Sequence, residues 1–240
     1  MTAPSLARLT VVELRKLVDT RSGRWLLITI GVLAAALVTL QLVFGGSGDR
    51  TFAAAFLVSV LPIALLLPVL GILLVTSEWS QRTALTTFTL VPRRHRVALA
   101  KVVAATLAGV ASVPVSVVVA TVATLASGGE WTFRAELLWY TALAQIIGVL
   151  MGVGFGMVLL NSPLAIVVYL ILPTVWTILG ATIRSLREAA AWLDTGVTTM
   201  ALFEPGMTGG DWAKLGVSVA VWVALPLAAG LVRVTTREVA

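Results

Sequence analysis

Six long stretches without a charged side chain constrain the fold of this chain more than any other feature. Each is 18 to 25 residues long, and a helix needs about 20 apolar residues to cross the hydrocarbon core of a bilayer. They cover residues 25–44, 52–75, 102–126, 137–160, 164–181 and 215–232. Strands of a membrane barrel would alternate in polarity over ~10-residue segments, whereas these stretches are continuously apolar. The sequence therefore predicts an all-α integral membrane fold, with six transmembrane helices in a single domain of residues 1–240.

The overall composition agrees with this class of protein. Hydrophobic residues make up 59% of the chain and charged residues only 12%, against about 25% charged residues in soluble domains. The net charge of +6 is confined to short segments between the apolar stretches, as a bilayer requires. We therefore expect a membrane lipid environment and no nucleic-acid partner.

The chain lacks the side chains that most enzymes and metal sites need. It has no cysteine and a single histidine, His95, which removes thiol chemistry and the usual zinc sites. A phosphate-binding loop needs Gly-Lys followed by Ser or Thr, but the three lysines are followed by Leu17, Val102 and Leu215. We expect no catalytic, cofactor-binding or metal-binding residues in this chain. If ATP drives its function, another chain must hydrolyse the ATP.

Basic residues predict how the chain is oriented. Twelve of the 17 Lys and Arg residues fall in the N-terminal segment 1–24, the segment 76–101 and the C-terminal tail. The remaining five lie in the segments that would face the other side. Because cytoplasmic loops carry the excess of Lys and Arg, both termini and residues 76–101 are predicted to be cytoplasmic.

Two segments outside the spans show helical patterns. Residues 5–20 form a modest amphipathic helix that would lie along the inner leaflet, the alternative being a flexible basic tail. Its apolar face carries Leu6, Val11, Leu14, Leu17 and Val18, and its polar face Arg8, Arg15 and Asp19. Residues 182–214 repeat apolar side chains at helical spacing, which predicts an outer hairpin of one or two short helices at the outer leaflet. The alternative is an ordinary capping loop.

The spans offer few specific side chains. Gly148, Gly152 and Gly156 form a stripe that lets another helix approach closely. We expect this helix to belong to the same chain, the alternative being an interface between subunits. Gln41 and Gln145 are polar groups that could line a substrate path, although a helix–helix hydrogen bond is the more common role of such residues. The spans contain no ionisable Asp, Glu, His, Lys or Arg, which argues against coupling to protons or ions.

Segment 76–101 combines a basic cluster with a short apolar pattern. Leu85, Phe88 and their neighbours predict a helix over residues 84–90 that ends before Pro92. Arg93, Arg94 and Arg96 follow it. One interpretation is that the segment does no more than fix the topology. The other is that its helix binds in a groove of a soluble partner.

Several of these residues make the chain resemble the type 2 ABC transporter permease family, which are membrane subunits of bacterial exporters. The resemblance rests on Glu13-Leu14-Arg15-Lys16-Leu17 with Trp25, on Glu78-x-x-x-Arg82-Thr83 with Pro92-Arg93-Arg94 and Ala100-Lys101, and on Trp222-x-x-x-Pro226-x-x-x-Gly230. Six spans with both termini inside and an outer hairpin before the last span agree with the family. The chain departs from it at Arg82, where glycine is often found.

The resemblance implies a coupling helix in segment 76–101 that contacts an ATPase subunit. The coupling residues it implies are Glu78, Arg82, Thr83, Leu85, Phe88, Pro92, Arg93, Arg94 and Arg96. It also implies a transporter of two ABC ATPase subunits, which hold ATP and Mg²⁺, and two permease subunits, expected here as a homodimer in the bacterial plasma membrane. The expected function is ATP-driven export of an amphipathic or hydrophobic substrate by alternating access. The alternatives are a non-transporting membrane assembly or immunity protein and a secondary transporter.

Overall fold

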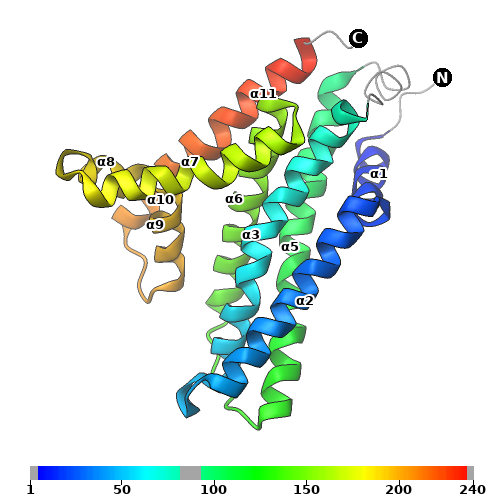
Figure 1. Ribbon diagram of the computed structural model, residues 1–240. Coiled ribbons are helices and arrows are strands. Elements are labelled where there is room, and N and C mark those ends of the chain that lie inside the picture. The colour runs from blue at the N-terminus through cyan, green and yellow to red at the C-terminus, as the bar shows by residue number, and fades with distance from the viewer. Residues whose placement is uncertain (1–4, 82–92, 237–240) are drawn as a thin grey trace.

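Helices dominate the computed structural model, which describes residues 5–81 and 93–236 (Figure 1). The long helices are α2 (Arg21–Phe44), α3 (Phe52–Ser80), α5 (Arg94–Ser127), α6 (Glu136–Leu159), α7 (Ser162–Thr182) and a last one of α10 (Gly209–Val219), a π-helical turn (Ala220–Ala224) and α11 (Leu225–Thr236). Within the described residues, these are the six helices long and apolar enough to cross a membrane. The predicted all-α membrane fold with six spanning helices is confirmed.

Side-chain caps fix where several helices begin. Ser5 accepts a hydrogen bond from the backbone of Arg8 and starts α1 (Leu6–Asp19). Thr20 follows directly and caps α2 through the backbone N–H of Gly23. Thr51 and Asn161 cap α3 and α7 in the same way. Because Thr20 alone separates α1 from α2, the amphipathic helix predicted over residues 5–20 is joined to the first long helix by a sharp corner.

Four of the long helices form the body of the molecule. Figure 1 shows α2, α3, α5 and α6 running lengthwise together, while α7 and α10 lean away from them. α11 returns to pack on α6, where Gly230 lies against Met157. The start of α1, the end of α3, the start of α5 and the end of α11 all lie at one end of the molecule (Figure 1), here called the α1 end. This arrangement agrees with two termini on the same side of a membrane.

Two helices extend well beyond the uncharged stretches. α3 continues to Ser80 and α5 already begins at Arg94, so both ends of segment 76–101 are helical. These extensions include Glu78 and Lys101, which lie inside the molecule. The predicted helix over residues 84–90 lies outside the described residues.

Close packing of α3 on α6 depends on glycine. A Cβ atom at Gly152 would overlap the carbonyl group of Pro68, and one at Gly156 would lie 3.3 Å from the Cα of Ile72. Gly71 of α3 faces Val149 in return. The stripe of Gly148, Gly152 and Gly156 thus faces a helix of the same chain.

The hairpin before the last helix is folded onto its neighbours. It contains two short helices, α8 (Arg187–Leu193) and α9 (Thr195–Met200), which agree with the predicted short helices. The indole N–H of Trp222 donates to the Leu193 carbonyl at 2.6 Å, and the hydroxyls of Thr198 and Ser218 lie 2.8 Å apart. These contacts hold the hairpin against α10 and the π-helical turn.

Candidate functional site

Four charged side chains meet inside the protein at the α1 end, and we call them the charge cluster: Glu13 and Lys16 of α1, Glu78 of α3 and Lys101 of α5. The Glu13 carboxylate bridges the two lysines, with Oε1 2.7 Å from Lys16 Nζ and Oε2 2.8 Å from Lys101 Nζ. Oε1 of Glu78 lies 2.6 Å from Lys16 Nζ and 3.2 Å from Lys101 Nζ. The cluster therefore connects three helices.

Burial makes these contacts important for the structure. The side chains of Glu13 and Lys101 are each 5% exposed and that of Glu78 is 8% exposed, while Lys16 keeps 34%. Lys101 also donates to the Leu74 carbonyl at 2.8 Å, so its ammonium has three acceptors. Two carboxylates and two ammonium groups give no net charge, which is the condition for keeping ionised groups away from water.

The protonation of Lys16 reflects the same balance. Burial alone lowers the pKa of its ammonium group because it penalises the charged form. Attraction to Glu13 and Glu78 outweighs this effect, and the net pKa is raised above its ordinary value. Lys16 therefore carries its charge throughout the physiological pH range.

The position of Glu13 along α1 explains why it reaches the interior. Thr10, Glu13 and Leu17 are spaced at helical intervals on one face, and all three are buried. Val11 and Val18 of the predicted apolar face are 48% and 56% exposed. α1 thus places a carboxylate on its buried face and leaves valines outside, where an adjoining lipid surface would cover them.

The structure describes four of the residues predicted to couple to an ATPase, namely Glu78, Arg93, Arg94 and Arg96. Glu78 is turned inward and engaged by Lys16 and Lys101, while Arg93 is exposed just before α5. Arg94 and Arg96 are half-buried in the first turn of α5. Arg82, Thr83, Leu85, Phe88 and Pro92 lie outside the described residues. The charge cluster is thus at the base of the segment to which these residues belong.

Gln145 lines a cavity of about 440 Å³, which we call the hairpin cavity. Its wall comes from α3, α6, α7, α9 and the 3₁₀ turn Ala201–Phe203. The Gln145 side chain is buried and its Nε2 has no hydrogen-bond partner. Tyr169 and Thr199 also face this space, while most of the wall is apolar. Such a site suits a molecule with an apolar body and a few hydrogen-bond acceptors.

Gln41, the other polar candidate, is not part of this wall. Its Nε2 donates to the Asp49 carbonyl at 3.1 Å, which ties the end of α2 to the following loop. Among residues 5–81 and 93–236, no three His, Asp or Glu side chains gather in a way that could hold a metal ion.

Comparison with models of known protein families gives no match, and comparison with curated proteins gives none either. The functional assignment therefore depends on the chain's own residues and geometry.

The sequence alone does not predict the charge cluster. It predicts Glu78 and Lys101 as members of the cytoplasmic segment 76–101, and Glu13 only as part of the motif that carries the family resemblance. One signal was present: Glu13 precedes Leu17 by four residues and so shares its face of the helix. A carboxylate on the buried face of an amphipathic helix needs a cationic partner, and both Lys16 and Lys101 supply one.

Proposed function

We propose that this chain is the membrane subunit of an ATP-driven exporter that moves an amphipathic or hydrophobic substrate, with a separate ATPase supplying the energy. The observation that supports this proposal is the position of the charge cluster. Glu78 lies near the end of α3 and Lys101 near the start of α5, at the two ends of segment 76–101. Glu13 of α1 binds Lys101 directly, and Lys16 of α1 binds Glu78. A partner that pushes on this segment would move three helices together.

The balance of buried charge favours an ATP-driven exporter over a secondary transporter. Among the described residues, the buried carboxylates are Glu13, Glu78 and Asp194. The first two are held by lysines, and Asp194 accepts from the backbone N–H groups of Gly196 and Val197 at the start of α9. Proton or ion coupling usually relies on an ionisable group within the membrane that changes its partner.

The hairpin cavity is the part of the molecule best suited to bind such a substrate. Gln145 lines this mostly apolar space between α6 and the hairpin, and its buried Nε2 has no hydrogen-bond partner. Because a lone buried donor costs about 1–3 kcal/mol of desolvation, a substrate with an acceptor there would gain affinity. Gln145→Leu should therefore weaken transport of polar-headed substrates, measured as uptake into inverted vesicles.

The coupling role has a direct test. The tagged chain is purified from its native membrane, every copurifying chain is identified, and ATP hydrolysis and substrate movement are measured together in vesicles. We expect a copurifying ATPase, and we expect the Arg82→Ala, Phe88→Ala double variant to lower substrate moved per ATP hydrolysed. Arg50→Ala, an exposed arginine at the opposite end, is the matched control.

Two results would contradict the proposal. Purification without any ATPase would favour a non-transporting membrane protein or a secondary transporter. An associated ATPase whose activity and coupling are unchanged in the Arg82→Ala, Phe88→Ala chain would separate this segment from energy transfer.

A further inference from the structure

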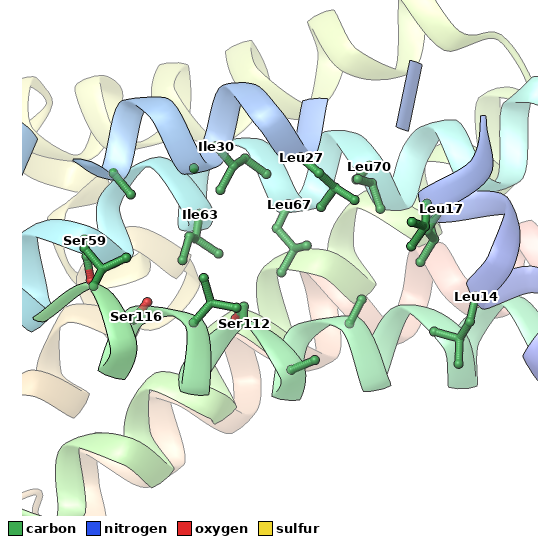
Figure 2. A pocket seen from close by; sticks show the side chains of 17 residues that line it. Leu14, Leu17, Leu27, Ile30, Ser59, Ile63, Leu67, Leu70, Ser112 and Ser116 are labelled. Carbon is green, nitrogen blue, oxygen red and sulfur yellow. The ribbon is translucent and has the colours of Figure 1, made fainter. Parts of the chain in front are cut away.

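A second cavity, of about 410 Å³, lies between α1, α2, α3 and α5, and we call it the α1 cavity. Figure 2 shows Ile30 of α2 and Ser112 of α5 on opposite walls, with Ile63 and Leu67 of α3 between them. Leu14 and Leu17 of α1 lie at one end. None of the residues around it belongs to the wall of the hairpin cavity.

The length of the α1 cavity matches one leaflet of a bilayer. Its α3 wall runs from Ser59 to Leu70, which corresponds to about 16 Å at ~1.5 Å per residue. The hydrocarbon core of a bilayer is ~30 Å thick, so each leaflet contributes about 15 Å. With α1 lying along the inner leaflet, as the sequence predicts, a cavity that starts beside α1 has the length of that leaflet.

The wall is almost entirely hydrocarbon. Of its three serines, Ser59 donates to the Phe56 carbonyl and Ser112 to the Gly109 carbonyl, each at 2.7 Å within its own helix. Ser116 has no partner and lies at the end away from α1 (Figure 2). A long apolar occupant therefore fits the space between Leu17 and Ser112 better than a polar one.

The cavity is open toward the side where a bilayer must lie. Val18, Leu27 and Val115 line it and are 56%, 36% and 52% exposed. Apolar side chains with this exposure on membrane helices face lipid chains. An acyl chain could thus enter sideways between α2 and α5 without crossing the protein.

The entrance carries the charge that a lipid headgroup would need. Arg15, Arg21 and Arg24 are exposed around the corner between α1 and α2, next to Leu14, Leu17 and Val18. Asp19 is the nearby acidic residue, so the corner is net positive. Basic groups at the depth of the headgroups attract lipid phosphate.

We propose that the α1 cavity holds one acyl chain of a membrane phospholipid, with the phosphate beside the arginines of the α1–α2 corner. The lipid fills the space that the four helices leave open and so holds α1 against α2 and α5. This proposal requires a membrane-spanning chain and is independent of whether the protein transports anything.

The test fills the cavity by substitution and measures retained lipid. Gly31 lines the cavity, and a Cβ atom placed there meets no heavy atom within 4 Å, so Gly31→Leu occupies the space without a backbone clash. Gly216 of α10 is equally free of neighbours but does not line the cavity, so Gly216→Leu is the matched control. Ala111→Leu fills the same space from α5 and serves as a second variant.

After extensive washing in detergent, native mass spectrometry should find phospholipid on the unaltered chain and on Gly216→Leu. Retention should fall by about tenfold or more in Gly31→Leu and Ala111→Leu, equivalent to at least ~1.4 kcal/mol of binding free energy. Added phospholipid should raise the unfolding temperature of the unaltered chain and of Gly216→Leu, but not of Gly31→Leu or Ala111→Leu. A ligand stabilises the native state only where it can bind to that state.

Three results would overturn the proposal. One is equal phospholipid retention by the filled variants and Gly216→Leu. Another is a retained molecule whose mass is not that of a phospholipid. The third is a disulfide between two Ala111→Cys chains in the membrane, which would show that a second copy covers the cavity. The chain has no cysteine of its own, so this disulfide would be unambiguous.

Discussion

Lys101 has the most buried ammonium group of the charge cluster, and its three acceptors come from two helices. Glu13 belongs to α1, while the Leu74 carbonyl and Glu78 belong to α3. Removing this one cation leaves two carboxylates facing Lys16 alone. At the scale of single residues, the stability of the α1 end therefore depends on charge balance more than on apolar contact.

We expect Lys101→Met to destabilise the protein by about 3–5 kcal/mol, the usual effect of removing one partner from a buried ion pair. Adding Glu13→Gln should restore part of this loss, because Lys16 and Glu78 then form a neutral pair. Thermal unfolding in detergent measures both effects. Lys214→Met, which removes a lysine far along the chain, is the control; equal destabilisation by both lysine variants would contradict the role of the cluster.

Lys16 gives the cluster a defined pH dependence. Its pKa is raised in the folded state, so its contribution is fully present below the unfolded value of 10.5 and is lost as the pH rises through the folded pKa. The difference in unfolding temperature between the unaltered chain and Lys16→Met should thus stay constant from neutral pH to about pH 10 and shrink above it. A difference that already shrinks near pH 8 would contradict this assignment.

What the sequence could predict at this scale was limited to residue types. Counting Lys101 and Lys16 as basic residues predicted orientation, but not that a carboxylate from α1 would bind both. That contact joins residues 88 positions apart, and nothing local in the sequence encodes the docking of α1 on α5. The glycine stripe was easier to predict because its spacing lies within one helix.

At the scale of helices, the seam between α3 and α6 is the most closely packed contact of the bundle core. Gly71 and Gly152 each bring a backbone against the neighbouring helix, and Pro68 fills the space beside Gly148. Helices in such close contact move as a pair. Tilting of the bundle would have to occur elsewhere, and the π-helical turn before Pro226 is a place where backbone hydrogen bonding already deviates from the regular pattern.

We expect Gly152→Ala to destabilise the protein by about 1–3 kcal/mol, because the added methyl group overlaps the Pro68 carbonyl and the two helices must separate. Gly216→Ala, where the space is open, should be neutral or stabilise by up to about 1 kcal/mol. Unfolding temperatures of the two variants give the comparison. Similar values for both would mean that α3 and α6 are not close in the folded protein.

Helix ends were less predictable than helix positions. Hydropathy identifies where a span is apolar, and it correctly gave six spans, but it stops at the first charges. α3 continues past Thr76 to Ser80, and α5 begins at Arg94, before Val102. The charged residues Glu78 and Lys101 of these extensions pair with one another inside the protein. A hydropathy pattern contains no information about such pairing.

At the scale of the whole molecule, the arrangement of helices supports a definite topology test. Because the chain has no cysteine, single cysteines report on accessibility without background. We expect His95→Cys to react with a membrane-impermeant thiol reagent only from the cytoplasmic side, and Gly46→Cys only from outside; neither change removes a counted Lys or Arg. Labelling of both positions from the same side would overturn the six-span topology.

The charge cluster also sets the order in which the protein must be assembled during synthesis. Glu13 and Lys16 precede all of the long helices in the chain, but Lys101 follows 88 positions after Glu13, on α5, the third of them. Until α5 is made and inserted, α1 carries a carboxylate for which the buried partner does not yet exist. α1 therefore has to wait at the membrane surface while three helices are laid down beside it. Docking of α1 then follows the insertion of α5, and a chain truncated before residue 101 would leave α1 undocked.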